Sequence, residues 1–362
     1  MNSALAATIG LILSIILIIK KVSPVYSLIL GALTGGLLAG WGLENTVTEM
    51  ISGIKDITPA IIRILAAGVL TGMLVKTGAA SSISQAIIKK LGAKQIYLAL
   101  ALSAMLLTAI GVFIDVAVIT IAPIALIAGS QLKLSRAKLL IAMIGGGKCG
   151  NIISPNPNSI IAAENFNAPL PSVMAANIIP AIIGLLFTIY IIVPLLPKGT
   201  ILQPTEQIED NMRLPSLRSS VIAPIVTIAL LTLRPLFGII IDPLVALSAG
   251  GIIGIVATRN WHKTNDCLSY GLGKMSTIAI LLIGTGALAG VIKASTIKDI
   301  LINLLAGWSN GGTIMAPLSG TLMCAATAST TAGATIASAS FAQSILGAGV
   351  AAVWGAAMIN AG

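Results

Sequence analysis

"GGGKCGNIISPNPNSII", residues 145–161, is the stretch of sequence that decides the fold of this chain. It holds three consecutive glycines, a lysine and two prolines, yet apolar runs flank it at 139–144 and 160–163. Proline cannot donate a backbone hydrogen bond and disfavours helix at the residue before it, so Pro155 and Pro157 predict a broken helix. Non-helical backbone at membrane depth is tolerated only where protein or a water-filled cavity solvates it. We therefore expect this break to line a binding site.

The composition places the whole chain in a membrane. Of its 362 residues, 56% are hydrophobic and only 9% are charged, and the mean hydropathy is +1.02. Soluble domains contain about a quarter charged residues. The apolar runs approach about 20 residues, as membrane helices require, and they do not alternate as barrel strands do. The sequence therefore predicts an all-α, polytopic integral membrane protein.

The net charge of +10 does not indicate a nucleic-acid partner, because the cations fall at the ends of apolar runs, as the positive-inside rule predicts. The three cysteines lie far apart and there is a single histidine, so neither a disulfide framework nor a metal site is indicated. We expect no cofactor. The first residues carry no basic segment, and the first apolar run is therefore interpreted as a membrane helix rather than a signal peptide.

Twelve apolar spans organise the chain. They run roughly over 4–19, 22–41, 57–75, 96–114, 116–130, 138–163 (broken), 173–196, 220–237, 240–258, 275–292, 312–345 and 348 to the end. One long polar segment, 198–219, separates a first membrane half (1–197) from a second (220–362). We expect this linker to be cytoplasmic.

Loop charges predict how the spans are oriented. Basic loops belong in the cytoplasm, and the acidic segment 42–56 belongs on the opposite side, so the N-terminus is expected outside. Spans 96–114 and 116–130 must then leave and return on one side, either as two crossings or as a re-entrant hairpin near 96–130. A second hairpin near 312–345 would enter from the other face, giving two inverted repeats of the kind that secondary transporters use. Segment 77–95 is predicted to be an amphipathic helix on the membrane surface.

Polar residues within the central break are the candidate substrate ligands. A lysine would neutralise a carboxylate, and the amides and hydroxyl would bind an oxygen-rich molecule: Lys148, Asn151, Ser154, Asn156 and Asn158. The alternative is an extramembrane loop in which Lys148 extends to the interface. A phosphate-binding loop is rejected, because Ala142 and Cys149 stand where that motif requires glycine and a hydroxyl residue.

Asp115 is the acidic residue inside a strongly apolar run without a basic neighbour within ten positions. An intramembrane carboxylate is a functional hypothesis by default, and desolvation would favour reversible protonation. The alternative is a water-exposed or structural carboxylate at a hairpin tip. Hydroxyl residues of the second hairpin are candidates for the same cavity or for close helix packing: Thr327, Ser329, Thr330 and Thr331.

Four segments in order resemble the gluconate permease (GntP) family of the wider ion transporter superfamily: "TGMLVKTGAASSISQAIIKKLGAKQ", "GVFIDVAVITIAPIALIAG", "GGGKCGNIISPNPNSIIAAENFNAPLP" and "TASTTAGATIAS". The resemblance implies a proton-coupled symporter for gluconate or a related sugar acid. It also implies a homodimer in which each protomer has a scaffold and a mobile transport domain. Asp115 matches an acidic position of the family's first hairpin. Asn156 replaces the histidine of a proline-rich run that many members carry, which favours a small hydroxy-carboxylate over gluconate itself.

These observations predict a multi-pass transporter of the inner membrane that carries a small organic acid together with protons. The alternatives are a cation/proton antiporter or another organic-anion transporter of the superfamily, for C4-dicarboxylates or citrate. An enzyme is not expected, because histidine clusters and acid pairs within a span are absent. The chain ends at "MINAG" (358–362) inside an apolar run, and we expect the printed sequence to be truncated in its second-half site.

Overall fold

The computed structural model describes residues 2–197, 214–296, 300, 310–327 and 330–362, without the side chains of 234–235 and 326–327. Helices are the only regular secondary structure in these ranges, as the composition predicts. The chain forms two compact units, and each unit draws on residues of both halves that the sequence predicts. Unit 1 comprises 1–64, 157–176 and 275–362, and unit 2 comprises 65–156 and 177–274.

Several helices of the described residues are long enough to span a membrane. Four stretches are long and apolar enough to cross a bilayer: Gly42–Lys76, Ile114–Gln131, Leu170–Leu195 and Trp261–Ala294. The helices Ala79–Leu91 and Ala93–Ala109 are bent by 107° relative to each other. If this pair is counted as one span, the described residues contain up to five membrane spans. A chain with this many apolar helices is polytopic, because lipid leaves the backbone no other partners than its own helical hydrogen bonds.

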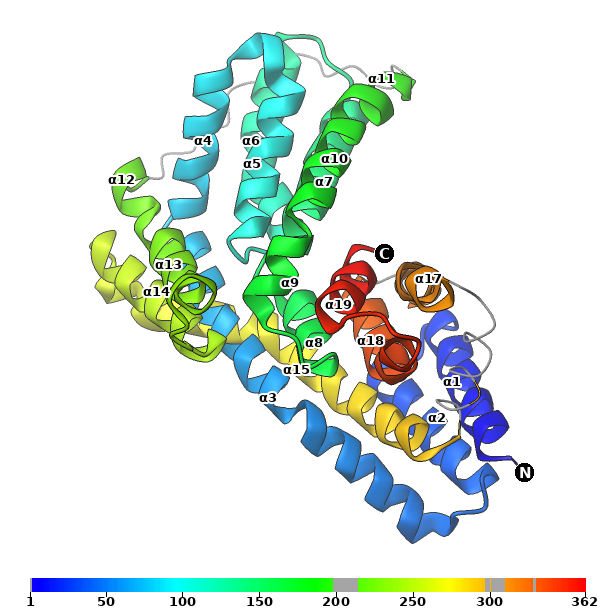
Figure 1. Ribbon diagram of the computed structural model, residues 1–362. Helices are drawn as coiled ribbons and strands as arrows, with labels where there is room; N and C mark the ends of the chain where they lie inside the picture. Colours follow the sequence, from blue (N-terminus) through cyan, green and yellow to red (C-terminus); the bar gives the residue numbers. More distant parts are fainter. Residues whose placement is uncertain (1, 198–213, 297–299, 301–309, 328–329) are drawn as a thin grey trace. The chain divides into compact units, whose positions relative to one another are not determined.

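Unit 2 contains the first predicted hairpin. Helices α5 (Ile96–Ala109) and α6 (Ile114–Gln131) are joined by a tip at 110–113, and both pack against α7 (Arg136–Ile152) (Figure 1). The predicted amphipathic segment forms α4 (Ala79–Leu91), which packs on α5, and η1 (Ala93–Gln95) follows it. Its place on the membrane surface stays a prediction.

The remaining elements of unit 2 are mostly apolar. They are α10 (Ile178–Phe187), the π-helical turn η2 (Thr188–Ile192), α11 (Val193–Leu195), α12 (Leu217–Ser220), α13 (Ile222–Phe237), α14 (Pro243–Ala257) and η3 (Trp261–Lys263). Leucine and isoleucine side chains on α10, α13 and α14 are exposed in the protein alone, which suits lipid contact.

Unit 1 contains the two helices of the second predicted hairpin, whose tip at 328–329 lies outside the described residues. Helices α17 (Gly311–Thr327) and α18 (Thr330–Gly347) pack against each other and against α19 (Ala352–Ala361) (Figure 1). The short helix α8 (Pro157–Asn165) packs on α18 and α19, and α9 (Leu170–Ala176) follows it. Helices α1 (Ser3–Ile19) and α2 (Pro24–Leu38) form an N-terminal pair in the same unit.

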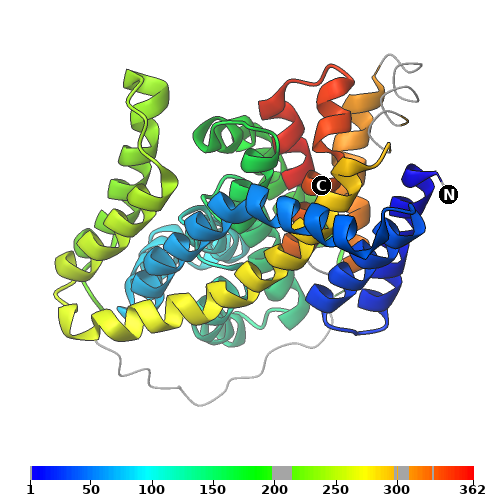
Figure 2. The same cartoon turned by 90° about the horizontal axis from the view of Figure 1, so that it is seen from below.

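Two long helices, α3 (Gly42–Lys76) and α15 (Thr264–Ala294), run side by side and contribute to both units (Figure 2). Segment 42–56, expected as a loop, is therefore the first part of a helix. Glycines bring the two backbones together. In unit 2 a Cβ added to Gly271 would collide with the carbonyl of Gly68, and in unit 1 one added to Gly53 would collide with that of Gly286.

The predicted broken helix is present, but its break is shorter than expected. Helix α7 continues through the three glycines to Ile152, and only 153–156 are non-helical before α8 begins at Pro157. The sequence places the break at 145–161, whereas residues 145–152 are helical, and the reason is packing. A Cβ on Gly146 would collide with the carbonyl of Ala101, and one on Gly150 with that of Met105, so these glycines seat α7 against α5.

Candidate functional site

The break after α7 gathers buried polar groups in unit 2. Asn156 donates from its amide nitrogen to both the backbone carbonyl and the side-chain oxygen of Asn151, each at 2.6 Å. The hydroxyl of Ser154 is fully buried and has no hydrogen-bond partner among the described residues. A buried unpaired hydroxyl costs about 1–3 kcal/mol, so this atom is a natural place for a ligand or water oxygen. Three of the five residues that the sequence predicted as ligands, Asn151, Ser154 and Asn156, are therefore buried at the end of α7 and in the break.

Two threonines in unit 2 bind the first hairpin to its neighbours, one at the tip and one on α5. Thr71 of α3 donates to the carbonyl of Gly111 in the tip at 2.8 Å, and Thr108 of α5 donates to the carbonyl of Gly147 in α7 at 2.8 Å. Both hydroxyls are buried. Thr71 therefore connects the tip with α3, and Thr108 connects α5 with the last turns of α7 before the break.

Asp115 lies in the first turn of α6, directly after this tip. Its side chain is 62% exposed and its Oδ2 is 3.4 Å from the Nζ of Lys274 on α15. The expected isolated carboxylate therefore has a cationic neighbour. Sequence inspection missed Lys274 because it lies 159 positions away along the chain.

Lys274 belongs to a small cationic cluster in unit 2. Its ammonium lies 6.0 Å from the ring centroid of Tyr270, and the ammonium of Lys76 lies 4.9 Å from the same centroid. An aromatic face stabilises cations at such distances by about 0.5–1 kcal/mol at exposed sites. The ring therefore offsets part of the repulsion between the two lysines.

Lys148 stands on α7 and not in the break itself. Its side chain is exposed, and it precedes Asn151 by three positions, so the two residues are neighbours on one helix face. The structure thus places this cation one turn before the break, within an unbroken helix.

The other predicted ligands lie in unit 1, in α8 and the second hairpin. Asn158 is buried in the first turn of α8, and the adjacent Ser159 accepts a hydrogen bond from the amide of Asn360 in α19 at 3.0 Å. Thr330 and Thr331 are half-buried at the start of α18. Ser329 and the side chain of Thr327 lie outside the described residues.

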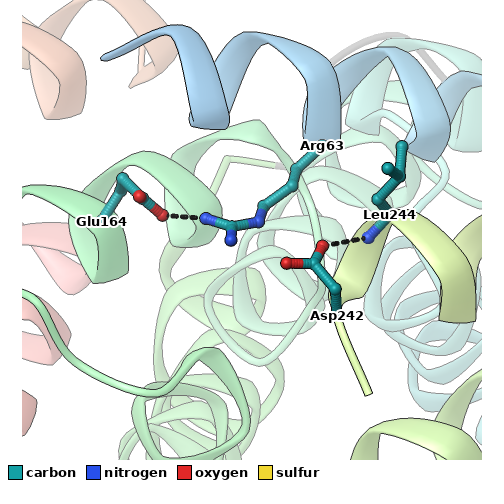
Figure 3. A network of polar contacts seen from close by, with 4 residues as sticks. All are labelled: Arg63, Glu164, Asp242 and Leu244. Carbon is teal, nitrogen blue, oxygen red and sulfur yellow. Dashed lines mark hydrogen bonds and ion pairs between the residues drawn. The ribbon is translucent and has the colours of Figure 1, made fainter. Parts of the chain in front are cut away.

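An ion pair at the end of α8 was not predicted from the sequence. Arg63 of α3 pairs with Glu164, and both side chains are only partly exposed (Figure 3). Figure 3 also draws Asp242 in unit 2, which caps α14 by accepting from the backbone N–H of Leu244 at 2.8 Å. The sequence does not indicate this pair, because Arg63 and Glu164 are 101 positions apart along the chain.

A pocket of about 540 Å³ lies beside this ion pair, entirely within unit 1. Asp56 and Lys293, 2.8 Å apart, stand on its wall together with Glu164 and Asn165. The amide of Asn165 donates to the hydroxyl of Ser338 on α18 at 2.9 Å. No sequence motif indicated this pocket, because its residues come from four separate helices.

The described residues contain no group of three or more histidine, cysteine, aspartate or glutamate side chains that would hold a metal ion. The polar groups instead sit at a helix break and at hairpins within an apolar, many-helix chain. Helices that stop inside a membrane protein expose backbone groups to a solute, and this plan is typical of membrane transporters.

Comparison with known proteins agrees with this class. The chain belongs to the GntP family of permeases, whose family model matches residues 3–359. The family and its relatives are permeases, not enzymes. An uncharacterized transporter of Haemophilus influenzae is 51% identical over 99% of this chain and 86% of its own length.

Two more distant relatives are named for their substrates. The Gnt-II system L-idonate transporter of Escherichia coli K12 is 24% identical, over 88% of this chain and 76% of its own length. The D-serine transporter DsdX of Escherichia coli O6:H1 is 22% identical, over 89% and 78% respectively. Among solved structures, the YdaH transporter of Alcanivorax borkumensis shares the fold, with a TM-score of 0.57 and 14% identity over 88% of this chain and 77% of that one.

Proposed function

We propose that this protein is a secondary active transporter that moves a small hydroxylated carboxylate across the inner membrane together with protons. The observation that carries the proposal is the helix break after Ile152, which contains the hydrogen-bonded, buried amides of Asn151 and Asn156 and the buried hydroxyl of Ser154, for which the described residues offer no hydrogen-bond partner. Such groups bind a polar solute in a site that lipid cannot enter. We further propose that the transporter works as a homodimer.

The substrate class is proposed from charge and from relatives. Lys148, Lys76 and Lys274 supply fixed positive charge in unit 2 and suit an anion. The named relatives transport L-idonate, which is a sugar acid, and D-serine, which also carries a carboxylate and a hydroxyl. A cation/proton antiporter is the weaker candidate, because these ammonium groups would repel its substrate. Thr327, Ser329, Thr330 and Thr331 are proposed as further ligands from the second hairpin.

Proton coupling is proposed to act through Asp115 and Lys274. In the ionised state the two side chains attract each other at 3.4 Å. A proton on Asp115 removes this attraction, and the Lys274 ammonium then becomes available to the carboxylate of the substrate. Proton and anion bind together in this scheme, as symport requires. The Tyr270 ring faces the ammonium groups of both Lys76 and Lys274, and the two positive charges favour the approach of an anion.

Uptake into proteoliposomes tests the proposal. Labelled D-gluconate, L-idonate, D-serine, citrate and succinate are compared with an acid-outside pH gradient and without one. We expect a hydroxylated monocarboxylate to accumulate only with the gradient. Accumulation that follows a sodium gradient, or export of Na⁺ against protons without uptake of any acid, would contradict the proposed function.

A further inference from the structure

The pocket of about 540 Å³ in unit 1 is a second, separate polar site. Helices α3, α8, α15 and α18 enclose it, and its volume lies within the range of about 300–1,000 Å³ that small-molecule sites occupy. It is not the helix break. On α18, Ser338 follows the first residue, Thr330, by eight positions, and on α8, Glu164 follows the first residue, Pro157, by seven. At about 1.5 Å per residue, the pocket therefore lies about 10–12 Å along each helix from its first residue.

Small residues keep the pocket hollow. Its walls include Gly53 on α3, Ala289 and Gly290 on α15, and Ala339 and Ala342 on α18. Positions 53 and 290 require glycine because the backbones of α3 and α15 are in contact there. A Cβ on Gly53 would collide with Gly290, and one on Gly290 would collide with the carbonyl of Glu49. No bulky side chain from these positions occupies the space, so a solute has room.

The polar lining matches a carboxylate that carries hydroxyls. Lys293 is the cation in the wall, its side chain is 66% exposed, and its ammonium has three N–H donors, of which one meets Asp56 at 2.8 Å. The neutral partners are amides and hydroxyls: Asn165, Asn167, Ser338, Ser340 and Gln343. An ammonium ligand is less suited, since Asp56 and Glu164 are already paired with Lys293 and Arg63.

We propose that this pocket is a second binding site for the substrate, in addition to the helix break. The carboxylate of a sugar acid contacts Lys293, and its hydroxyls contact the amides and serines of α8 and α18. This inference rests on the proposed function for the class of its ligand. It adds a site that the break alone does not supply.

Binding stoichiometry tests the inference. Equilibrium dialysis with labelled D-gluconate on the full chain in detergent is expected to find two sites per chain. Ala339→Phe on α18 and Ala289→Phe on α15 each place a ring at the pocket lining, and each should leave one site. Ala294→Leu, at the end of α15 and outside the pocket lining, is the matched control and should keep both sites. Lys293→Gln should weaken one site about tenfold and leave the other unchanged.

The failures of the two proposals are distinguishable. One site per chain in the wild type, or two sites that persist in both phenylalanine variants, overturns the second site. If pH-driven uptake continues in that case, the proposed transport function stands. Absence of both binding and uptake for D-gluconate, L-idonate and D-serine overturns the proposed function and the second site together.

Discussion

Asp115 and Lys274 form the ion pair to which we assign proton coupling in the proposed function. Asp115→Asn imitates the protonated carboxyl permanently. We expect it to abolish accumulation driven by a pH gradient while leaving substrate counterflow at least partly intact, because exchange needs no net proton movement. Both assays are run on one proteoliposome preparation. Accumulation like that of the wild type would show that the proton binds elsewhere.

A charge-swapped variant separates the coupling role of this pair from a structural one. Asp115→Lys combined with Lys274→Asp keeps the attraction between the two positions, which at this exposure is worth about 1 kcal/mol or less. We expect the double variant to be produced and folded like the wild type but to lack pH-driven uptake. Full recovery of uptake would assign the pair to stability alone.

Lys148 tests whether charge near the break attracts the substrate. Because its side chain is exposed, Lys148→Gln should lower affinity for carboxylates by about 1 kcal/mol, or about fivefold, rather than by the larger amount expected for a buried pair. Lys138→Gln, at the opposite end of α7, is the control and should bind normally. The half-saturation of counterflow measures both. Equal affinity in Lys148→Gln for every acid tested would remove Lys148 from the site.

At the scale of elements, glycine determines how closely helices pack, and α15 offers an internal comparison. A Cβ on Gly271 would collide with the carbonyl of Gly68 on α3, whereas a Cβ on Gly273, two residues further, would meet nothing within 4 Å. Gly271→Ala is therefore expected to destabilise the protein by about 1–3 kcal/mol through overpacking. Gly273→Ala should be neutral or stabilising by up to about 1 kcal/mol, because alanine favours helix.

Thermal unfolding in detergent measures this difference. We expect the midpoint to fall for Gly271→Ala and to hold or rise for Gly273→Ala. Equal midpoints would mean that α3 and α15 do not pack as closely as their glycines indicate.

At the scale of the whole molecule, the orientation in the membrane is the main prediction. Loop charges place Lys133, after the first hairpin, in the cytoplasm and Asn310, before the second hairpin, outside. In a variant without Cys149, Cys267 and Cys324, a cysteine at 133 and one at 310 should react with impermeant reagents from opposite sides. Labelling of both from one side would contradict the inverted repeats.

The sequence by itself determined the class of protein, the positions of most helices, both hairpins and the presence of a break. These features follow from local causes. Lipid leaves a backbone no partner except its own helix, and Pro155 and Pro157 remove donors wherever the chain folds. The buried amide pair of Asn151 and Asn156 was predictable for the same reason, because the two residues are close along the chain.

Only the tertiary structure decided where the break begins and which charges meet. The glycines at 145–147 permit either open backbone or close packing, and the carbonyl of Ala101 on α5 selects packing. Lys274 reaches Asp115 across 159 positions, and Arg63 reaches Glu164 across 101. The pocket in unit 1 likewise exists because four distant helices bring small residues together. Contacts of this kind depend on how helices pack in three dimensions, which no local pattern of residues encodes.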